Sequence, residues 1–478
     1  MNTQPLFESL LAWLPELILS FGGMAVILLG VFTPPTSARG GGAVLAAAWI
    51  TLLASAAALA MAPVSGPAFF DLIVLDQTSL LFRWLALGVV ALVALMVASS
   101  KDVDEAWTGE YVGILLLIGV GLMLMAEANH LLIAYLALEL VSLSSYVLVG
   151  LARDARSSEA ALKYLLFGAL SSGIMLFGFS LVYGLTGELS LPGILEAVER
   201  FGAPQTGALV ISLSLILAGL AFKISMAPFH MWTPDVYEGA PIPVTAMLSV
   251  GPKAAGFALL LRITEVVRPI WSSVEPLLLV LTVVTMTLGN LVALAQTNVK
   301  RLLAYSTIGQ VGYLLIGFTV NTTLGLEALF AYLVAYLFMN LGAFACVVAV
   351  CSDAKSESLD AFRGLGRRAP ALAFCLALFL LSLAGIPPML GFIGKFLLFG
   401  SAVQADRLVL ALIAAVNSAI ALYYYVNIIR LMYLAAPERP APLAPALGLR
   451  VAVGVCSAAT LGLGLFPGRL LTWLRTLI

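Results

Sequence analysis

The chain has 478 residues, of which 62% are hydrophobic and only 10% are charged. Soluble domains average roughly 45–50% apolar and about 25% charged residues, so this composition excludes an ordinary soluble protein and predicts a membrane protein. The formal net charge of -1, with no basic tail, argues against a nucleic-acid partner.

Apolar runs long enough to cross a bilayer as helices, about 20 residues each, recur along the chain. We expect fourteen helices in an all-α polytopic fold, with approximate ranges 9–31, 41–62, 78–98, 111–127, 130–151, 160–185, 206–239, 241–265, 272–296, 301–320, 324–351, 370–402, 407–434 and 448–474. The first run has neither a preceding basic residue nor a small-residue cleavage site, which favours a retained helix over a signal peptide. Only Ala128 and Asn129 separate the fourth and fifth runs, which predicts a tight hairpin.

Two of the runs, 206–239 and 370–402, are too long for simple helices, and each contains a proline break. Each comes two spans after a similar pentapeptide, Tyr146-Val-Leu-Val-Gly150 in the fifth run and Tyr313-Leu-Leu-Ile-Gly317 in the tenth. A five-helix offset would place the two copies in the membrane in opposite senses. Inverted repeats with broken helices are typical of transporters.

The repeats predict four segments. They are a three-helix segment (1–110), a first five-helix repeat with helices 4–8 (111–265), a second with helices 9–13 (272–434) and a C-terminal helix (448–478). Lys and Arg are about twice as frequent in one set of alternate loops as in the other, and basic loops favour the cytoplasmic side. This bias predicts that both termini lie outside the cytoplasm.

A carboxylate lies near the middle of the fifth run. Glu139 shares one helical face with Tyr135, Ser142 and Tyr146, which lie at i-4, i+3 and i+7 from it. Such a polar stripe must face protein or water, because lipid cannot satisfy it. Glu139 is either a proton-carrying or charge-coupling group or a structural, hydrogen-bonded carboxylate.

Two lysines flank the first proline break. A lysine at mid-bilayer costs about 2.5–3.5 kcal/mol on insertion scales, so a chain that retains several is expected to use them. Lys223 precedes Pro228, whose ring frees backbone carbonyls that need water or polar partners. Lys253 follows Thr245 and Ser249 at i+8 and i+4, on one face of the eighth run. His230 lies between the lysines and is either a proton relay or a capping or packing histidine.

The second break also adjoins a lysine. Lys395 follows two prolines and three glycines in the segment 385–395, which predicts an unwound helix beside a buried cation. Lys163 lies a few residues into the sixth run, near the predicted cytoplasmic side. A lysine at that depth either functions in the membrane or extends its ammonium group to the interface.

Other polar and charged residues are less distinctive. Arg83 and Arg430 are close to helix ends and are interpreted as interfacial anchors, whereas Glu16 and Glu127 have no assigned role. Neutral stripes fill the second half: Ser306, Gln310 and Tyr313; Tyr332, Tyr336 and Asn340; Asn417, Tyr424 and Asn427. They either join helices through hydrogen bonds or hold water between charged sites.

The four cysteines lie in apolar segments without a CxxC spacing, as Cys346, Cys351, Cys375 and Cys456. We therefore expect buried packing residues and no iron–sulfur or zinc site. Lysine suits a path without a cofactor. Burial favours its neutral form and a nearby carboxylate favours its charged form, so moving the carboxylate loads or releases a proton.

The segment His230–Phe257, HMWTPDVYEGAPIPVTAMLSVGPKAAGF, resembles the signature of subunit N of respiratory complex I, the proton-pumping NADH–quinone oxidoreductase. The resemblance extends over essentially the whole chain. It includes NHLLIAYLALELVSLSSYVLVG (129–150), KYLLFGALSSGIMLFG (163–178), NVKRLLAYSTIGQVGYLLIG (298–317) and LSLAGIPPMLGFIGKF (381–396). Subunits of multi-subunit sodium/proton antiporters are similar, but the VYEGAP and PKAAGF segments favour subunit N.

The resemblance implies roles for individual residues. Glu139 would sense a neighbouring subunit, Lys223 would be its electrostatic partner, and Lys253 would be the central lysine. Lys395 would lie at the far end of the polar axis, and Lys163 matches a family lysine on the sixth helix. In the inferred second copy Ser306 falls opposite Glu139, so equivalent roles for the two copies do not follow.

The resemblance also implies a setting. The chain would be a non-redox subunit of a translocase in the bacterial inner membrane, in contact with other membrane subunits, including neighbouring antiporter-like ones. It would hold no cofactor, because NADH, FMN, iron–sulfur clusters and quinone would bind to partner subunits. A sodium/proton antiporter subunit is the alternative. A membrane-bound transferase would need acidic or histidine clusters on sizeable loops, whereas the chain has two histidines, His130 and His230.

Overall fold

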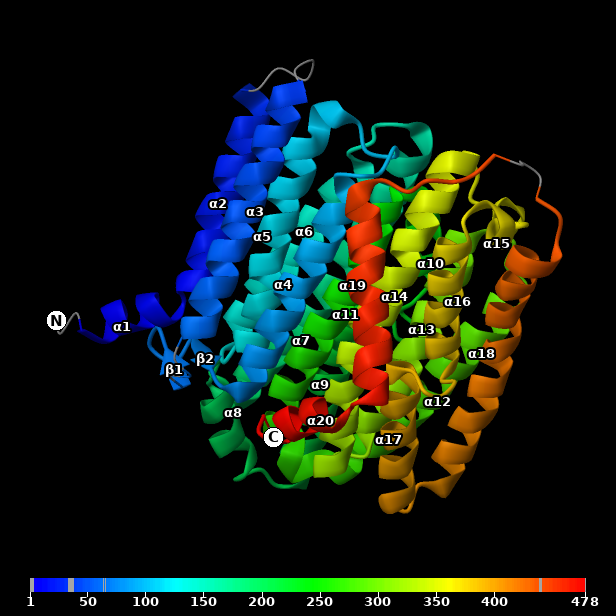
Figure 1. Cartoon of the computed structure of the whole chain (residues 1–478). Coiled ribbons are helices and arrows are strands. Elements are labelled where there is room, and N and C mark those ends of the chain that lie inside the picture. The colour runs from blue at the N-terminus through cyan, green and yellow to red at the C-terminus, as the bar shows by residue number, and fades with distance from the viewer. Residues whose placement is uncertain (1–3, 33–37, 63, 65, 438–440, 478) are drawn as a thin grey trace. The chain divides into compact units, whose positions relative to one another are not determined.

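The computed structural model describes residues 4–32, 38–62, 64, 66–437 and 441–477 (Figure 1). The first half contains α1 (Gln4–Ala12), α2 (Leu14–Phe32), α3 (Ala38–Met61), β1 (Gly66–Ala68), β2 (Ile73–Leu75), α4 (Gln77–Val97), η1 (Glu105–Trp107), α5 (Thr108–Glu127), α6 (Leu131–Gly150), α7 (Ala155–Thr186), α8 (Leu191–Val198) and α9 (Ala203–Ile224). The second contains α10 (Trp232–Gly239), α11 (Ile242–Val267), η2 (Arg268–Ile270), α12 (Trp271–Ala293), α13 (Val299–Thr319), α14 (Thr323–Ala354), η3 (Leu359–Phe362), α15 (Leu365–Arg368), α16 (Pro370–Ala384), α17 (Leu390–Gln404), α18 (Leu408–Leu434), α19 (Leu447–Leu465) and α20 (Gly468–Arg475).

The expected all-α membrane fold is confirmed. Within the described residues, twelve segments are long and apolar enough to cross a membrane, with α11 and α12 counted as one, and α16 and α17 are shorter apolar helices. The exact number of fourteen crossings stays a prediction. The strands β1 and β2 form an antiparallel hairpin that the apolar pattern did not indicate.

The first predicted run is divided. The chain forms α1 and α2 where one helix beginning at residue 9 was expected. Pro15 is the second residue of α2, and a proline is tolerated there because the first helical turn has no internal partner for its backbone N–H. The predicted hairpin at Ala128 and Asn129 is confirmed, since α5 ends at Glu127 and α6 begins at Leu131.

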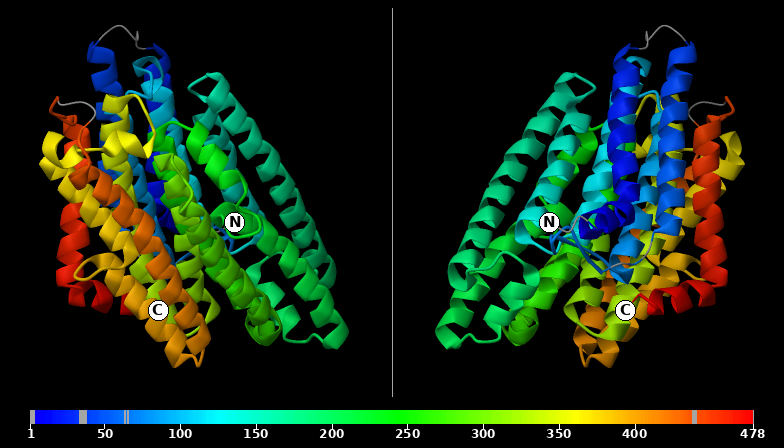
Figure 2. Two further views of the ribbon diagram at one scale, coloured as in Figure 1. Left: turned by 90° about the vertical axis from the view of Figure 1, so that its right-hand side faces the viewer. Right: turned by 90° about the vertical axis from the view of Figure 1, so that its left-hand side faces the viewer.

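The chain forms two compact units. Unit 1 comprises Met1–Ala91, Val103–Ile224 and Gly251–Leu277, and unit 2 comprises Leu92–Asp102, Ser225–Val250 and Leu278–Ile478. In unit 1, α5 packs against α2 and α6, and α7 packs against α6 and α9 (Figure 2). In unit 2, α14 is the central helix, with α13, α16, α17 and α19 against it, and nearly all of its side chains are buried.

Both predicted helix breaks are confirmed. Helix α9 ends at Ile224 and α10 begins at Trp232, while α16 ends at Ala384 and α17 begins at Leu390. At the second break, Gly385 adopts a φ of 89° and closes α16, a backbone conformation that glycine adopts without a steric penalty. The breaks leave helix ends inside apolar segments, where their carbonyls need polar partners.

Glycines bring α2 and α5 of unit 1 close together. A Cβ atom added to Gly109 would lie 2.6 Å from the Cα atom of Gly30, a backbone atom that no rotamer change can move. We predict that Gly109→Leu destabilises the chain by about 1–3 kcal/mol, the usual effect of overpacking. Gly173→Leu on α7 is the control, because a Cβ there meets no atom within 4 Å. Thermal unfolding in detergent measures both, and equal midpoints for the two variants would contradict the packing described here.

Candidate functional site

Lys223 is buried inside unit 1, one residue before the end of α9. Its side chain has no exposed surface. The Nζ atom donates a hydrogen bond to Ser142 Oγ on α6 at 2.9 Å, and that hydroxyl donates to the carbonyl of Leu138 at 2.7 Å. A buried ammonium group therefore has one neutral hydrogen-bond acceptor from the neighbouring helix, which does not balance its charge.

The carboxylate of Glu139 supplies the opposite charge. It lies one turn before Ser142 on α6, is half-buried, and interacts electrostatically with Lys223. Its Oε1 atom is buried and has no hydrogen-bond partner among the described residues. The interpretation of Glu139 as a structural carboxylate required hydrogen bonds, and at Oε1 the described residues supply none.

Lys253 completes a group of three charged residues in unit 1. It is fully buried on α11 and close enough to Lys223 for the two side chains to interact electrostatically. Gly256, one turn later, lets α11 approach the end of α9, since a Cβ there would lie 2.4 Å from Cγ2 of Ile224. The packing thus brings together Glu139, Lys223 and Lys253, which we call the charged group.

Lys395 lies in unit 2, near the start of α17, and is 3% exposed. Its Nζ donates to Ser418 Oγ on α18 at 2.9 Å and to the carbonyl of Ala384, the last residue of α16, at 3.2 Å. The same atom lies 4.1 Å from the centre of the Tyr313 ring, within cation–π range. Lys395 therefore satisfies the end of the broken helix with its ammonium group.

The neutral polar stripes of unit 2 form two hydrogen-bonded groups, which meet where the rings of Tyr424 and Tyr425 contact each other. Gln310 of α13 donates to Tyr425 of α18 at 3.2 Å and accepts from Tyr332 of α14. Around Asn290 of α12 the hydrogen-bonded residues are Tyr313, Asn417 and Tyr424. Since Tyr313 also contacts Lys395, these uncharged groups extend from the lysine into the core.

Some of the predicted stripe residues have other partners. Asn427 accepts a hydrogen bond from Arg430 at 2.9 Å at the surface of α18. Thr245 donates to the carbonyl of Tyr237, and Ser249 accepts from Asn340 at 2.6 Å, all within unit 2. The helical spacing placed each of these residues on a face, but it did not indicate which neighbour the face meets.

His230 and Lys163 lie apart from the contacts described above. His230 is 7% exposed in the break before α10, and its Nδ1 has no hydrogen-bond partner within the described chain. Lys163 pairs with Glu159 on its own helix α7 at 2.9 Å, and its side chain is 41% exposed. This exposure agrees with the interfacial alternative for Lys163, and the histidine stays a candidate relay.

Sequence reasoning missed a buried ionic cluster in unit 1. Arg83 was interpreted as an interfacial anchor, and this was wrong, because its guanidinium is buried and contacts Glu16 at 2.7 Å and Glu127 at 3.2 Å. Charged residues within apolar runs were the available signal. Their separation along the chain left the pairing undetermined.

Basic residues at the start of α13 hold α10 in unit 2. Arg301 contacts Asp235 and Glu238 at 2.8 Å each, and Lys300 donates to the carbonyl of Ala240 at 2.7 Å. These charge-assisted bonds fix the short helix that follows the first break.

The comparisons with known proteins agree with this architecture. Residues 128–421 match the family described as NADH:quinone oxidoreductase/Mrp antiporter, TM. The NADH-quinone oxidoreductase subunit N of Trichlorobacter lovleyi is 42% identical, over 98% of this chain and 97% of that protein. The chain belongs to the family of NADH-quinone oxidoreductase subunit N. The family resemblance of the sequence is confirmed, and the chain is an antiporter-like, multi-pass membrane subunit.

Solved structures place the fold in the same group. A chain of respiratory complex I from Thermus thermophilus with bound aureothin is 35% identical, with a TM-score of 0.81 over 96% of this chain and 98% of that chain. A chain of the Mrp complex from Dietzia sp. DQ12-45-1b has a TM-score of 0.83, over 100% of this chain and 97% of that chain, at 24% identity. At that identity the second likeness supports the fold alone.

Proposed function

We propose that this chain translocates protons across the membrane, as a non-redox subunit of an NADH–quinone oxidoreductase. The observation that carries the proposal is the charged group, in which one half-buried carboxylate stands beside two fully buried lysine side chains. The proton carriers would be Glu139, Lys223 and Lys253, with Lys395 as a further one in unit 2. Lys163 and His230 would be further candidates for proton transfer.

The mechanism follows from the electrostatics of burial. Charges of opposite sign about 5 Å apart attract by roughly 3 kcal/mol at an effective dielectric constant of about 20. Moving Glu139 away by a few ångströms, or neutralising it, would weaken this attraction by about 1 kcal/mol or more, and lower the proton affinity of Lys223 by about fivefold or more. Lys223 would then release a proton toward Lys253, whose side chain would accept it as the neutral amine.

The same reasoning applies to the lysine of unit 2. The partners of Lys395 described above, a hydroxyl, a carbonyl and an aromatic ring, are all uncharged. They accept hydrogen bonds from the ammonium group without compensating its charge fully, so the lysine can lose its proton. We propose that the network around Gln310 and Asn290 holds the water molecules through which that proton moves.

The driving force would come from other subunits. NADH, FMN, iron–sulfur clusters and quinone would be bound by partner chains, and their redox chemistry would reach this subunit by moving or neutralising Glu139. The partners would be other membrane subunits, including neighbouring antiporter-like ones. The location would be the bacterial inner membrane, with both termini on the periplasmic side.

Purification of the tagged chain from its native membrane in mild detergent tests the assignment. We expect co-purification with flavin- and iron–sulfur-containing subunits, and NADH-driven quinone reduction in the eluate. The sodium/proton antiporter alternative predicts a redox-silent assembly of antiporter-like chains with sodium-dependent proton flux. That second result would overturn the proposal.

The proton path is tested by Lys253→Ala in inverted membrane vesicles. We predict a fall of about tenfold or more in NADH-driven proton uptake, because removing one proton carrier adds at least about 1.4 kcal/mol to the barrier. The amount of assembled subunit is expected to stay unchanged. The control is Lys101→Ala, which removes a lysine from an exposed loop. An unchanged number of protons moved per NADH in Lys253→Ala would exclude Lys253 from the path.

A further inference from the structure

The buried ionic cluster of unit 1 has one positive and two negative side chains. It consists of Glu16 on α2, Arg83 on α4 and Glu127 on α5. Arg83 is 2% exposed, and neither glutamate has exposed surface. If both carboxyl groups were ionised, the cluster would have a net charge of -1 inside the protein, which is strongly unfavourable without a further cation.

Within the described part of the chain, the other groups around the cluster do not supply that cation. Trp13 donates its Nε1 hydrogen to Glu127 Oε2 at 2.9 Å, and the carbonyl of Ala12 accepts from Arg83 at 3.2 Å. Arg262 of α11 comes near, donating to the carbonyl of Ala126 at 2.9 Å. Its guanidinium, however, makes two short bonds to Asp76, at 2.6 and 2.7 Å, which balance its charge.

The geometry distinguishes the two carboxyl groups. Arg83 makes two parallel bonds to Glu16, from Nε at 2.7 Å and from Nη2 at 2.8 Å, which is the arrangement of an ionised carboxylate. Glu127 receives only a 3.2 Å approach from Nε, and its Oε1 has no hydrogen-bond partner among the described residues. Both carboxyl groups contact the same nitrogen, and like charges within about 6 Å disfavour a second ionised carboxylate.

We propose that Glu127 is a proton-binding site outside the charged group, with its Oε1 carrying a proton while Glu16 is the ionised partner of Arg83. The proton is the ligand, and the neutral acid accepts the Trp13 hydrogen bond through its other oxygen. The cluster then has no net charge, which is consistent with its complete burial.

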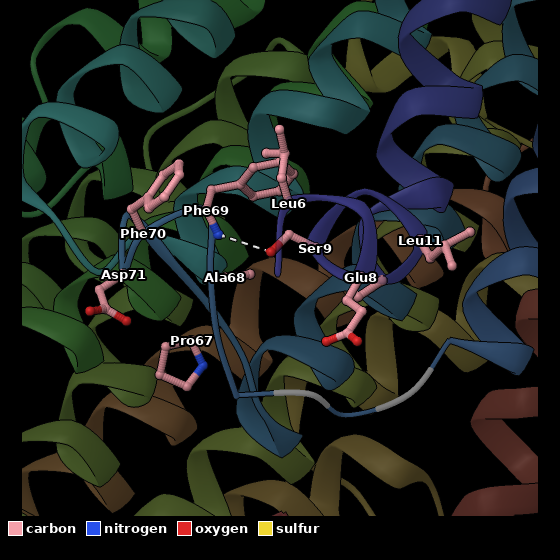
Figure 3. A pocket seen from close by; sticks show the side chains of 10 residues that line it. Leu6, Glu8, Ser9, Leu11, Pro67, Ala68, Phe69, Phe70 and Asp71 are labelled. Carbon is pink, nitrogen blue, oxygen red and sulfur yellow. Dashed lines mark hydrogen bonds between the residues drawn. The ribbon is translucent and has the colours of Figure 1, made fainter. Parts of the chain in front are cut away.

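A surface pocket lies next to a residue that contacts the cluster. Arg83 donates a hydrogen bond to the carbonyl of Ala12. Ala12 also lines a pocket of about 540 Å³ between α1 and the loop of the β1–β2 hairpin. Figure 3 shows Glu8 and Asp71 at this pocket, with Ser9 accepting a hydrogen bond from the backbone of Phe69. On this proposal, water would reach the cluster from the pocket past Ala12, and the bound proton is expected to exchange in deuterated buffer.

Infrared spectroscopy of the purified full-length chain in lipid vesicles tests the proposal. The wild-type chain is expected to show the carbonyl stretch of a protonated carboxyl group, and Glu127→Gln is expected to lose one such group. Glu327→Gln is the matched control. Glu327 is also nearly buried but accepts a hydrogen bond from Arg475 at 2.9 Å, so its loss should leave the band unchanged.

Thermal unfolding of the same variants shows which glutamate carries the proton. Glutamine resembles a neutral acid, so Glu127→Gln should keep the wild-type unfolding midpoint, whereas Glu16→Gln should lower it by breaking the paired bonds to Arg83. Two results would overturn the proposal. One is a carboxyl band unaffected by Glu127→Gln. The other is a Glu127→Gln midpoint lowered as much as that of Glu16→Gln.

Discussion

Burying an ammonium group among apolar helices is the constraint on which this structure depends. Each lysine in the membrane must find compensation from neighbours, because lipid supplies none. Lys223 finds it in Ser142 and Glu139 of α6, and Lys395 in Ser418, Ala384 and Tyr313. In both units the compensation is incomplete, and the proposed proton exchange at these lysines depends on that.

The broken helices serve this requirement. A continuous helix satisfies its own carbonyls, so it has none to offer a cation. At the break between α16 and α17 the carbonyl of Ala384 is released and accepts from both Lys395 and Ser418. Among the described residues, the partners of Lys395 are thus uncharged, whereas in unit 1 the carboxylate of Glu139 stands near Lys223.

The sequence was sufficient for much of this architecture. Apolar run lengths predicted the helices, and prolines at 228, 387 and 388 predicted both breaks, because each effect is local to the backbone. The face shared by Glu139 and Ser142 was likewise set by helical spacing. These features depend on residues within a few positions of one another.

Contacts between distant segments were not accessible in this way. Nothing near Arg83 indicates that Glu16 and Glu127 meet it, and the hydrogen bond between Lys223 and Ser142 joins residues on separate helices. The division of the first run into α1 and α2, and the β1–β2 hairpin, also escaped the apolar pattern. Tertiary packing decides such pairings, and a single sequence does not report it.

A double-mutant cycle on Glu139 and Lys223 tests the central claim, that the two act as one charge-coupled pair. Glu139→Gln, Lys223→Ala and the double variant would be compared by the initial rate of NADH-driven proton uptake in inverted vesicles. If they form a pair, the double variant is predicted to be no slower than Lys223→Ala alone, with a coupling free energy of about 1 kcal/mol or more. The account would be contradicted if the fold-reductions in proton-uptake rate of the two single variants multiply in the double variant.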